Sequence, residues 1–131
     1  MLYRLNIEKI RLRGKVVSGL GVGRKYVELY RQMINKYLGI NPFPGTLNID
    51  VGHDVSELLA KTTSKLIPPP FPGYGAVIAY KGYIKDIEVY VIKPCITSHG
   101  WNILEIISEK NLRKQLKLKD GDEIEIVIVP L

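Results

Sequence analysis

Residues 7–24, IEKIRLRGKVVSGLGVGR, join an alternating segment to a glycine-rich one. Ile10 and Leu12 each stand between charged neighbours, which is the period-two pattern of a half-buried strand. Three glycines then fall within five residues, at positions 19, 21 and 23, a spacing that is incompatible with the interior of a regular element. The sequence therefore predicts a strand that runs into a glycine-rich loop.

A helix is predicted directly after this loop, from Arg24 to Leu38. Apolar residues recur there at the three- and four-residue spacing that marks one face of a helix, at Val27, Tyr30, Ile34, Tyr37 and Leu38. Gly39 is the expected end of this helix, because glycine readily adopts the left-handed conformation found after the last helical residue.

Turns and further strands follow the helix. The sequence predicts a rigid turn over 41–45, a strand over 46–51 and a stiff proline-rich connection over 68–73. Residues 53–66 have the apolar spacing of a short helix. The C-terminal half alternates repeatedly, and we expect its strands at 76–80, 83–92, 102–107 and 123–129, the first two forming a hairpin across Lys81-Gly82.

A second helix is predicted before the last strand. Ser108 is its expected N-cap, and Leu112 and Leu116 would form its buried face. Asp120-Gly121-Asp122 then predicts a tight turn. Some six strands with two or three short helices indicate a mainly β fold, a small closed barrel. We do not expect a doubly wound parallel sheet, because the strands do not alternate regularly with helices.

Length and composition bound the class of protein. The 131 residues suit one domain, which we expect to span 1–131 with residues 1–8 as a short N-terminal extension. No apolar run approaches the roughly 18 residues that cross a bilayer, and Met1–Arg13 does not have the pattern of a signal peptide. The single cysteine, Cys95, excludes an internal disulfide framework and a cysteine-rich zinc site. We therefore expect a cytoplasmic protein without a membrane partner.

Positive charge is concentrated at the start of the chain. The formal net charge is +6, and residues 1–40 hold nine basic and two acidic side chains. Residues 41–131 hold ten basic and eleven acidic ones. Such a distribution attracts a polyanion, which is a nucleic acid, an acidic membrane surface or a phosphate-bearing small molecule. Composition does not choose among these.

Two motifs have the chemistry of a phosphate and metal site. In the glycine-rich loop, backbone N–H groups can approach an anion closely, and Arg24 adds a planar donor fork; a tight structural turn is an equal alternative. In the strand after Gly45, Thr46 and Asn48 point to the same side and present the hard oxygen ligands that Mg²⁺ accepts. Asp50 has the same parity and could assist, whereas the alternative is a polar surface strand.

Glu105 is the candidate carboxylate. It lies within an apolar stretch, so it either faces water or is held in a cleft for recognition or proton transfer. Thr97 is a candidate hydrogen-bond donor to a phosphate or a ligand carbonyl. His99 could be a base, although a solvated or packed residue is its simpler explanation, and Trp101 could stack on a planar ligand, although core packing is the simpler explanation there. Lys110 and Arg113 would share one face of the second helix, which is either a solvated surface or part of an anion site.

In order and spacing, four segments resemble the archaeal CTP-dependent riboflavin kinases. They are Val17–Arg24, Gly45–Asn48, Thr97 with Glu105–Ile107, and Leu112-Arg113 running into Leu118–Asp122. The resemblance implies a barrel of the cradle-loop type that transfers the terminal phosphoryl group of CTP to the 5′-hydroxyl of riboflavin, giving FMN and CDP. Some members carry an additional N-terminal DNA-binding domain, which we do not expect here because about 13 residues precede the barrel.

The same resemblance implies roles for individual residues. Nucleotide binding falls on Gly19, Leu20, Gly21, Val22, Gly23 and Arg24, and on Lys110, Asn111, Leu112 and Arg113. Mg²⁺ or another divalent cation falls on Thr46 and Asn48, and the flavin on Thr97 and Glu105. Phosphoryl transfer needs positioning and charge neutralisation, and Glu105 is the candidate base or orienter of the ribityl hydroxyl. The expected partners are CTP/CDP and riboflavin/FMN, with no nucleic acid, and we expect a monomer.

Two noncatalytic interpretations compete with the kinase. The basic N-terminal third and eight tyrosines would also suit a nucleic-acid-binding barrel. A transcription-regulator-like barrel would share the topology, and fold alone does not separate it from an enzyme. The combination of the glycine-rich loop, the Thr46/Asn48 pair and Glu105 favours the kinase, because a regulator has no need of it.

Overall fold

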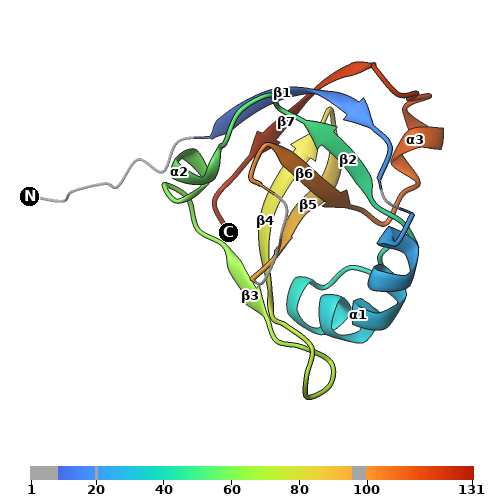
Figure 1. Ribbon diagram of the computed structural model, residues 1–131, viewed down its shortest axis with the longest axis vertical. Helices are drawn as coiled ribbons and strands as arrows, with labels where there is room; N and C mark the ends of the chain where they lie inside the picture. Colours follow the sequence, from blue (N-terminus) through green and yellow to red (C-terminus); the bar gives the residue numbers. More distant parts are fainter. Residues whose placement is uncertain (1–8, 20, 96–99) are drawn as a thin grey trace, which may run out of the picture.

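The computed structural model describes residues 9–19, 21–95 and 100–131 (Figure 1). Leu20, Thr97 and His99 therefore lie outside the described residues. In the described ranges the strands are β1 (Ile10–Val17), β2 (Leu47–Asp50), β3 (Lys65–Ile67), β4 (Val77–Ile84), β5 (Ile87–Pro94), β6 (Ile103–Ile107) and β7 (Glu123–Ile128). The helices there are α1 (Gly23–Leu38), α2 (Ser56–Leu59) and α3 (Leu112–Gln115). None of these helices is long and apolar enough to cross a membrane.

Six of the described strands close into a barrel. Their order is β4-β5-β6-β2-β1-β7, and β7 pairs back with β4 at Gly82↔Ile128 and Tyr83↔Val127. Every pairing is antiparallel, and β3 adds to the open side of β4 outside the closed ring. The prediction of a small closed β-barrel is confirmed, with one additional strand.

Side-chain alternation separates the inside of the barrel from its outside. On β2, Leu47 and Ile49 point into the main core, and on β6 Leu104 and Ile106 do the same. Buried residues of β1, β4, β5 and β7 complete this core. Because side chains alternate along a strand, Asn48 and Glu105 must face outward. The apolar pattern that fills the barrel thereby places the polar candidates on its outer wall.

Helix α1 covers part of that outer wall (Figure 1). Its buried residues Val27, Tyr30 and Ile34 pack in a second core with Ile92 and Ile107, which are outward-facing residues of β5 and β6. The helix ends as predicted, because Gly39 adopts φ 73° and its N–H donates to the Asn35 carbonyl at 2.9 Å. At 16 residues α1 matches the helix predicted from Arg24 to Leu38, and α2 and α3 are short, with four residues each.

The predicted hairpin turn across Lys81-Gly82 is wrong. Strand β4 continues through both residues to Ile84, and the chain turns at Lys85-Asp86, where Lys85 has φ 55°. Gly82 serves the closure of the barrel instead. A Cβ at this position would lie 2.8 Å from the Val127 carbonyl oxygen, so the glycine lets β7 approach β4 closely.

The predicted start of the second helix is also wrong. Asn111 is the N-cap of α3, and its side-chain oxygen accepts from the Lys114 N–H at 3.2 Å. Ser108 is buried and donates instead to the Glu88 carbonyl at 3.1 Å. Lys110 therefore precedes the helix, so it does not share a helical face with Arg113.

The segment between β2 and β4 differs from its prediction as well. Residues 53–66 contain the short helix α2, but strand β3, which begins at Lys65, is absent from the sequence-based prediction. The proline-rich connection is extended only at its start, because the Tyr74 N–H donates to the Phe71 carbonyl at 3.3 Å and closes a turn. Pairing with β4 stabilises β3, and such a long-range contact leaves little trace in a three-residue strand.

Candidate functional site

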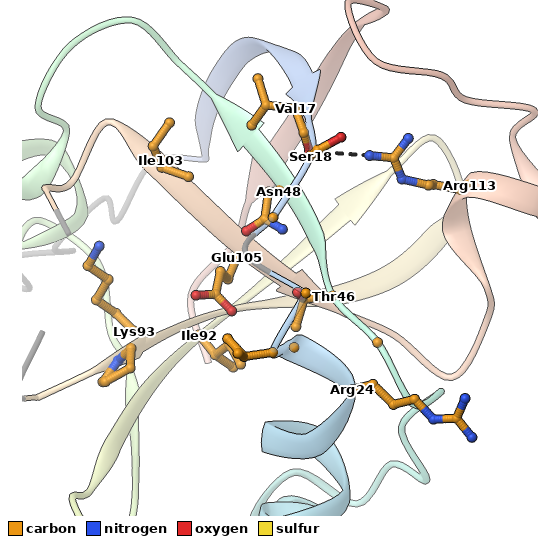
Figure 2. A pocket seen from close by; sticks show the side chains of 16 residues that line it. Val17, Ser18, Arg24, Thr46, Asn48, Ile92, Lys93, Ile103, Glu105 and Arg113 are labelled. Carbon is orange, nitrogen blue, oxygen red and sulfur yellow. Dashed lines mark hydrogen bonds between the residues drawn. The ribbon is translucent and has the colours of Figure 1, made fainter. Parts of the chain in front are cut away.

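A cavity of about 560 Å³ lies where the glycine-rich segment meets the outer wall of the barrel (Figure 2). The loop side of the cavity is formed by residues 17–19 and 21–24, and the β2 side by Gly45, Thr46 and Asn48. The remaining lining residues come from β5, β6 and α3, and are Ile92, Lys93, Pro94, Ile103, Glu105 and Arg113. Segments that are distant in the sequence therefore meet at one site.

Strand register places the polar side chains next to one another. Asn48 of β2 lies opposite Val17 of β1 on one side and opposite Glu105 of β6 on the other. Glu105 in turn lies opposite Ile92 of β5. Residues directly opposite each other in antiparallel strands share a face, with Cβ atoms about 5 Å apart. Asn48 and Glu105 are therefore neighbours on the outer wall, as Figure 2 shows.

The glycine-rich segment packs directly against Thr46 and Asn48. A Cβ at Gly19 would overlap the side-chain amide nitrogen of Asn48, and a Cβ at Gly23 would overlap the hydroxyl oxygen of Thr46. Gly21 has φ 77°, a conformation that other residues rarely adopt. The glycines are thus required by close approach at two positions and by backbone conformation at the third, so this loop is more than a generic turn.

The first turn of α1 adds positive potential to the cavity. The helix begins at Gly23 after Val22, which provides no side-chain cap, and no acidic residue lies in its first turn. The initial N–H groups of a helix lack intrahelical acceptors and carry the positive end of its dipole. Because Val22, Gly23 and Arg24 line the cavity, this end of α1 suits an anion such as a phosphate group.

Two arginines border the cavity and differ in how firmly their side chains are held. Arg24 is exposed and pairs with Glu28 one turn later, with 3.2 Å between Nε and Oε1. Arg113 is held more firmly, because one terminal nitrogen donates to Asp120 at 2.7 Å and to the Val17 carbonyl at 3.2 Å. The bond from Arg113 to the end of β1 is the dashed line in Figure 2. Arg113 is therefore the better oriented cation.

Thr46 and Asn48 fit a hard divalent cation. Both line the cavity, and Asn48 is only 9% exposed. A hydroxyl and an amide oxygen are neutral ligands that Mg²⁺ accepts when water and phosphate oxygens complete its shell. Asp50 does not join them, since its carboxylate accepts from the Gly52 N–H at 2.8 Å and it is not one of the described residues that line the cavity.

The second predicted nucleotide segment is divided by the structure. Arg113 lines the cavity, whereas Leu112 is buried in the barrel core and Asn111 caps α3. Lys110 borders a different cavity of about 500 Å³. The roles of Lys110, Asn111 and Leu112 in nucleotide binding therefore stay predictions.

Lys93 is a lining residue that the sequence analysis missed. Its side chain is 4% exposed, and its ammonium donates to the Gly100 carbonyl at 2.8 Å and lies 5.3 Å from the centre of the Trp101 ring. Burial lowers the pKa of Lys93, and the carboxylates of Glu105 and Asp54 oppose that shift. The sequence did contain a signal for Lys93, because a lysine within the apolar run of β5 is expected to be buried, and a buried charge needs hydrogen-bond or ionic partners.

Comparison with known proteins identifies the family. The family model of the CTP-dependent riboflavin kinase domain, described as "Domain of unknown function DUF120", matches residues 16–128. A relative from Staphylothermus marinus named riboflavin kinase is 64% identical over 119 residues, which cover 91% of this chain and 92% of that protein. The chain therefore belongs to the CTP-dependent riboflavin kinase family.

More distant relatives have the same name. The riboflavin kinase of Ignicoccus hospitalis is 37% identical over 139 residues, covering 98% of this chain and 76% of that protein. The riboflavin kinase of Pyrobaculum islandicum is 41% identical over 138 residues, covering 98% of this chain and 64% of that longer protein. The resemblance predicted from the glycine-rich and Gly-Thr-Leu-Asn segments is confirmed.

Proposed function

We propose that this protein transfers the terminal phosphoryl group of CTP to the 5′-hydroxyl of riboflavin, giving CDP and FMN, with the help of Mg²⁺ or another divalent cation. The observation that carries the proposal is the contact of Gly19 and Gly23 with Asn48 and Thr46, beside Glu105. This arrangement brings an anion-binding backbone, hard oxygen ligands and a carboxylate to one cavity. Membership of the CTP-dependent riboflavin kinase family supports both substrates.

The phosphates would occupy the end of the cavity formed by the loop. Backbone N–H groups of the glycine-rich segment and of the first turn of α1 would donate to phosphate oxygens, and Arg113 would add a fixed charge. Thr46 and Asn48 would hold the divalent cation, which when bound neutralises phosphate charge. The protein contributes mainly positioning and electrostatic stabilisation, which are what phosphoryl transfer requires.

Glu105 would meet the acceptor hydroxyl. In Figure 2 it lies in the middle of the cavity, with Thr46 and Asn48 close by, Arg24 and Arg113 to one side and Lys93 to the other. The 5′-oxygen of riboflavin attacks the terminal phosphorus, the bond from that phosphorus to the bridging oxygen breaks, and CDP leaves. As general base, the Glu105 carboxylate would take up the hydroxyl proton; as orienter, it would only accept a hydrogen bond from the hydroxyl, and the proton would pass to the transferred phosphoryl group.

The flavin would extend past Glu105, away from the arginines. In Figure 2 Ile103 and Lys93 lie on that side of Glu105, and Ile92 and Pro94 are further apolar residues that line the cavity. An apolar wall with a few polar groups suits a planar aromatic ring system. Thr97 is a further predicted flavin contact and lies outside the described residues.

A direct assay tests the proposal. Purified protein is incubated with riboflavin, Mg²⁺ and either CTP or ATP, and FMN is separated by chromatography. We expect FMN with CTP, and much less when Glu105→Gln replaces the wild type, while riboflavin binding weakens little. Glu57→Gln, an exposed change on α2, is the matched control and should keep full turnover.

The same assay distinguishes the alternatives. Absence of FMN with either nucleotide, together with salt-sensitive binding to random DNA, would favour the noncatalytic nucleic-acid-binding or regulator-like barrel. FMN formation from ATP alone would refute the choice of CTP. Normal turnover of Glu105→Gln would reduce Glu105 to a binding residue. We further propose that the protein acts in the cytoplasm, which its single cysteine favours, and that it is a monomer.

A further inference from the structure

Asp120 joins three segments that are far apart in the sequence. One of its carboxylate oxygens accepts from the Ser18 hydroxyl, at the start of the glycine-rich segment. The other accepts from Arg113 of α3 at 2.7 Å, and the same arginine nitrogen donates to the Val17 carbonyl at 3.2 Å. Ser18, Asp120 and Arg113 thus form a cluster that ties the glycine-rich segment to α3, and we name it the Asp120 cluster.

Backbone hydrogen bonds hold the turn that carries Asp120 against β1. The Gly121 N–H donates to the Val16 carbonyl, and the Val16 N–H donates to the Asp122 carbonyl, each at 2.8 Å. Gly121 has φ 92°, which allows the chain to turn sharply at this point. These two backbone hydrogen bonds to β1 fix the position of Asp120 beside the glycine-rich segment, and they do not involve the Asp120 side chain.

Asp120 acts on the cavity indirectly. Ser18 and Arg113 line the cavity, but Asp120 is not one of the described residues that do so. A carboxylate close to bound phosphates is unfavourable by its charge alone, so its presence requires another reason. The two hydrogen bonds provide that reason, because they hold Ser18 and Arg113 in place before a ligand arrives and so reduce the entropy lost on binding.

We propose that Asp120 is a positioning residue for nucleotide binding, which holds Arg113 and the beginning of the glycine-rich segment in the arrangement that accepts phosphates. The inference rests on the proposed function and extends it to a residue outside the cavity. Arg113 uses one terminal nitrogen for Asp120 and Val17, and among the described residues its other terminal nitrogen and Nε have no hydrogen-bond acceptor, so they can donate to a phosphate group.

The direction in which Asp120→Ala changes the KM for CTP distinguishes a positioning role of Asp120 from a purely electrostatic one. If Asp120 only repelled the nucleotide, Asp120→Ala would lower the KM for CTP. If Asp120 positions Arg113 and the loop, the same change raises that KM, by about tenfold, because two charge-assisted hydrogen bonds are lost at a partly exposed site. The KM for riboflavin should change by less than about twofold, since the flavin end of the cavity is not touched.

The control is Asp122→Asn in the same turn. Its carboxylate accepts from the Lys119 N–H at 2.9 Å and has no bond to Ser18 or Arg113 among the described residues, so its KM for CTP should stay within about twofold of the wild type. An equal rise in the KM for CTP in Asp120→Ala and Asp122→Asn would overturn the proposal, because general damage to the turn would then explain both.

A double-mutant cycle completes the test. Since Asp120 is proposed to act partly through Arg113 and partly through Ser18, the combined KM effect of Asp120→Ala and Arg113→Ala should be smaller than the product of their separate effects, whereas effects that multiply in full would contradict the proposal. CDP affinity measured by calorimetry gives the same comparison without catalysis. If the wild type binds CDP but forms no FMN, the proposed function fails while the role of Asp120 is still decided by these affinities.

Discussion

Gly19→Ala is the sharpest test of how the cavity is built. A Cβ at this position would overlap the side-chain nitrogen of Asn48, whose side chain is 9% exposed and lies opposite Glu105 on the neighbouring strand. The atom in the way is the end of an asparagine side chain, which can rotate. We therefore expect a loss of only about 1 kcal/mol in the free energy of unfolding, at the low end for inserting a methyl group into a packed site.

The functional effect of Gly19→Ala should be much larger than the loss of stability. Rotation of Asn48 moves the oxygen proposed to hold the divalent cation, and a misplaced ligand or reacting group can lower activity about 100-fold. That factor corresponds to about 2.7 kcal/mol of transition-state stabilisation. The Mg²⁺ concentration for half-maximal activity should rise along with the loss of kcat/KM, while Tm falls by only about 4 °C.

Two other glycines provide the comparison. A Cβ added at Gly75 would have no atom within 4 Å, and the residue has no positive φ, so Gly75→Ala should leave kcat/KM and Tm unchanged. Gly21 also has open space but a φ of 77°, so Gly21→Ala tests backbone strain without a steric clash, at about 1–2 kcal/mol. If Gly19→Ala and Gly75→Ala have the same kcat/KM and the same Mg²⁺ dependence, the packing of the loop against Asn48 does not control the site.

Three further outcomes are expected. Lys93→Met should raise the KM for riboflavin several-fold and change the KM for CTP little. The free energy of unfolding should change by less than about 1 kcal/mol, because removing a buried charge also removes its desolvation cost. A change in the KM for CTP alone would refute the position of Lys93 at the flavin end of the cavity. Hydrogen bonds from Ser18 and Arg113 lower the pKa of Asp120, so its stabilising effect is complete above the ordinary aspartate value of about 3.9 and is lost as pH falls through the lower folded-state value. The Tm difference between wild type and Asp120→Asn should therefore be constant at neutral pH and shrink below about pH 4; a difference that grows on acidification would contradict this sign. Gly82→Ala should destabilise the protein by about 1–3 kcal/mol in urea unfolding, because its Cβ would press on the backbone of β7, and equal stability to Gly75→Ala would show that the closure tolerates a side chain.

Local sequence patterns predicted the structure correctly where the conformation of a segment depends on residues within that segment. The periodicity of residues 24–38 predicted α1, and Gly39 predicted its end, because both signals act within a few residues. The alternation of β2 placed Thr46 and Asn48 on one side, and in the structure both line the same cavity. The glycine spacing predicted a loop whose backbone can approach an anion closely, and in the structure Gly19 and Gly23 lie against Asn48 and Thr46.

Local patterns failed where a distant strand determined the outcome. Gly82 suggested a turn because glycine commonly breaks strands, yet here it permits the contact with β7 that closes the barrel. Ser108 is a good N-cap by type, but burial against the Glu88 carbonyl engages its hydroxyl, and Asn111 caps α3 instead. Lys93 was missed because its partners, Gly100 and Trp101, meet it only in the folded chain.

The amino-acid sequence by itself determined the class of fold, the helix after the glycine-rich loop, the residue types of the site and, through its motifs, the family. Only the tertiary structure decided that Gly19 lies against Asn48, that Asn48 lies beside Glu105, and that Asp120 reaches Ser18 and Arg113. The physical reason is that periodicity encodes which face of an element is apolar, whereas strand register and barrel closure depend on packing between segments up to about a hundred residues apart.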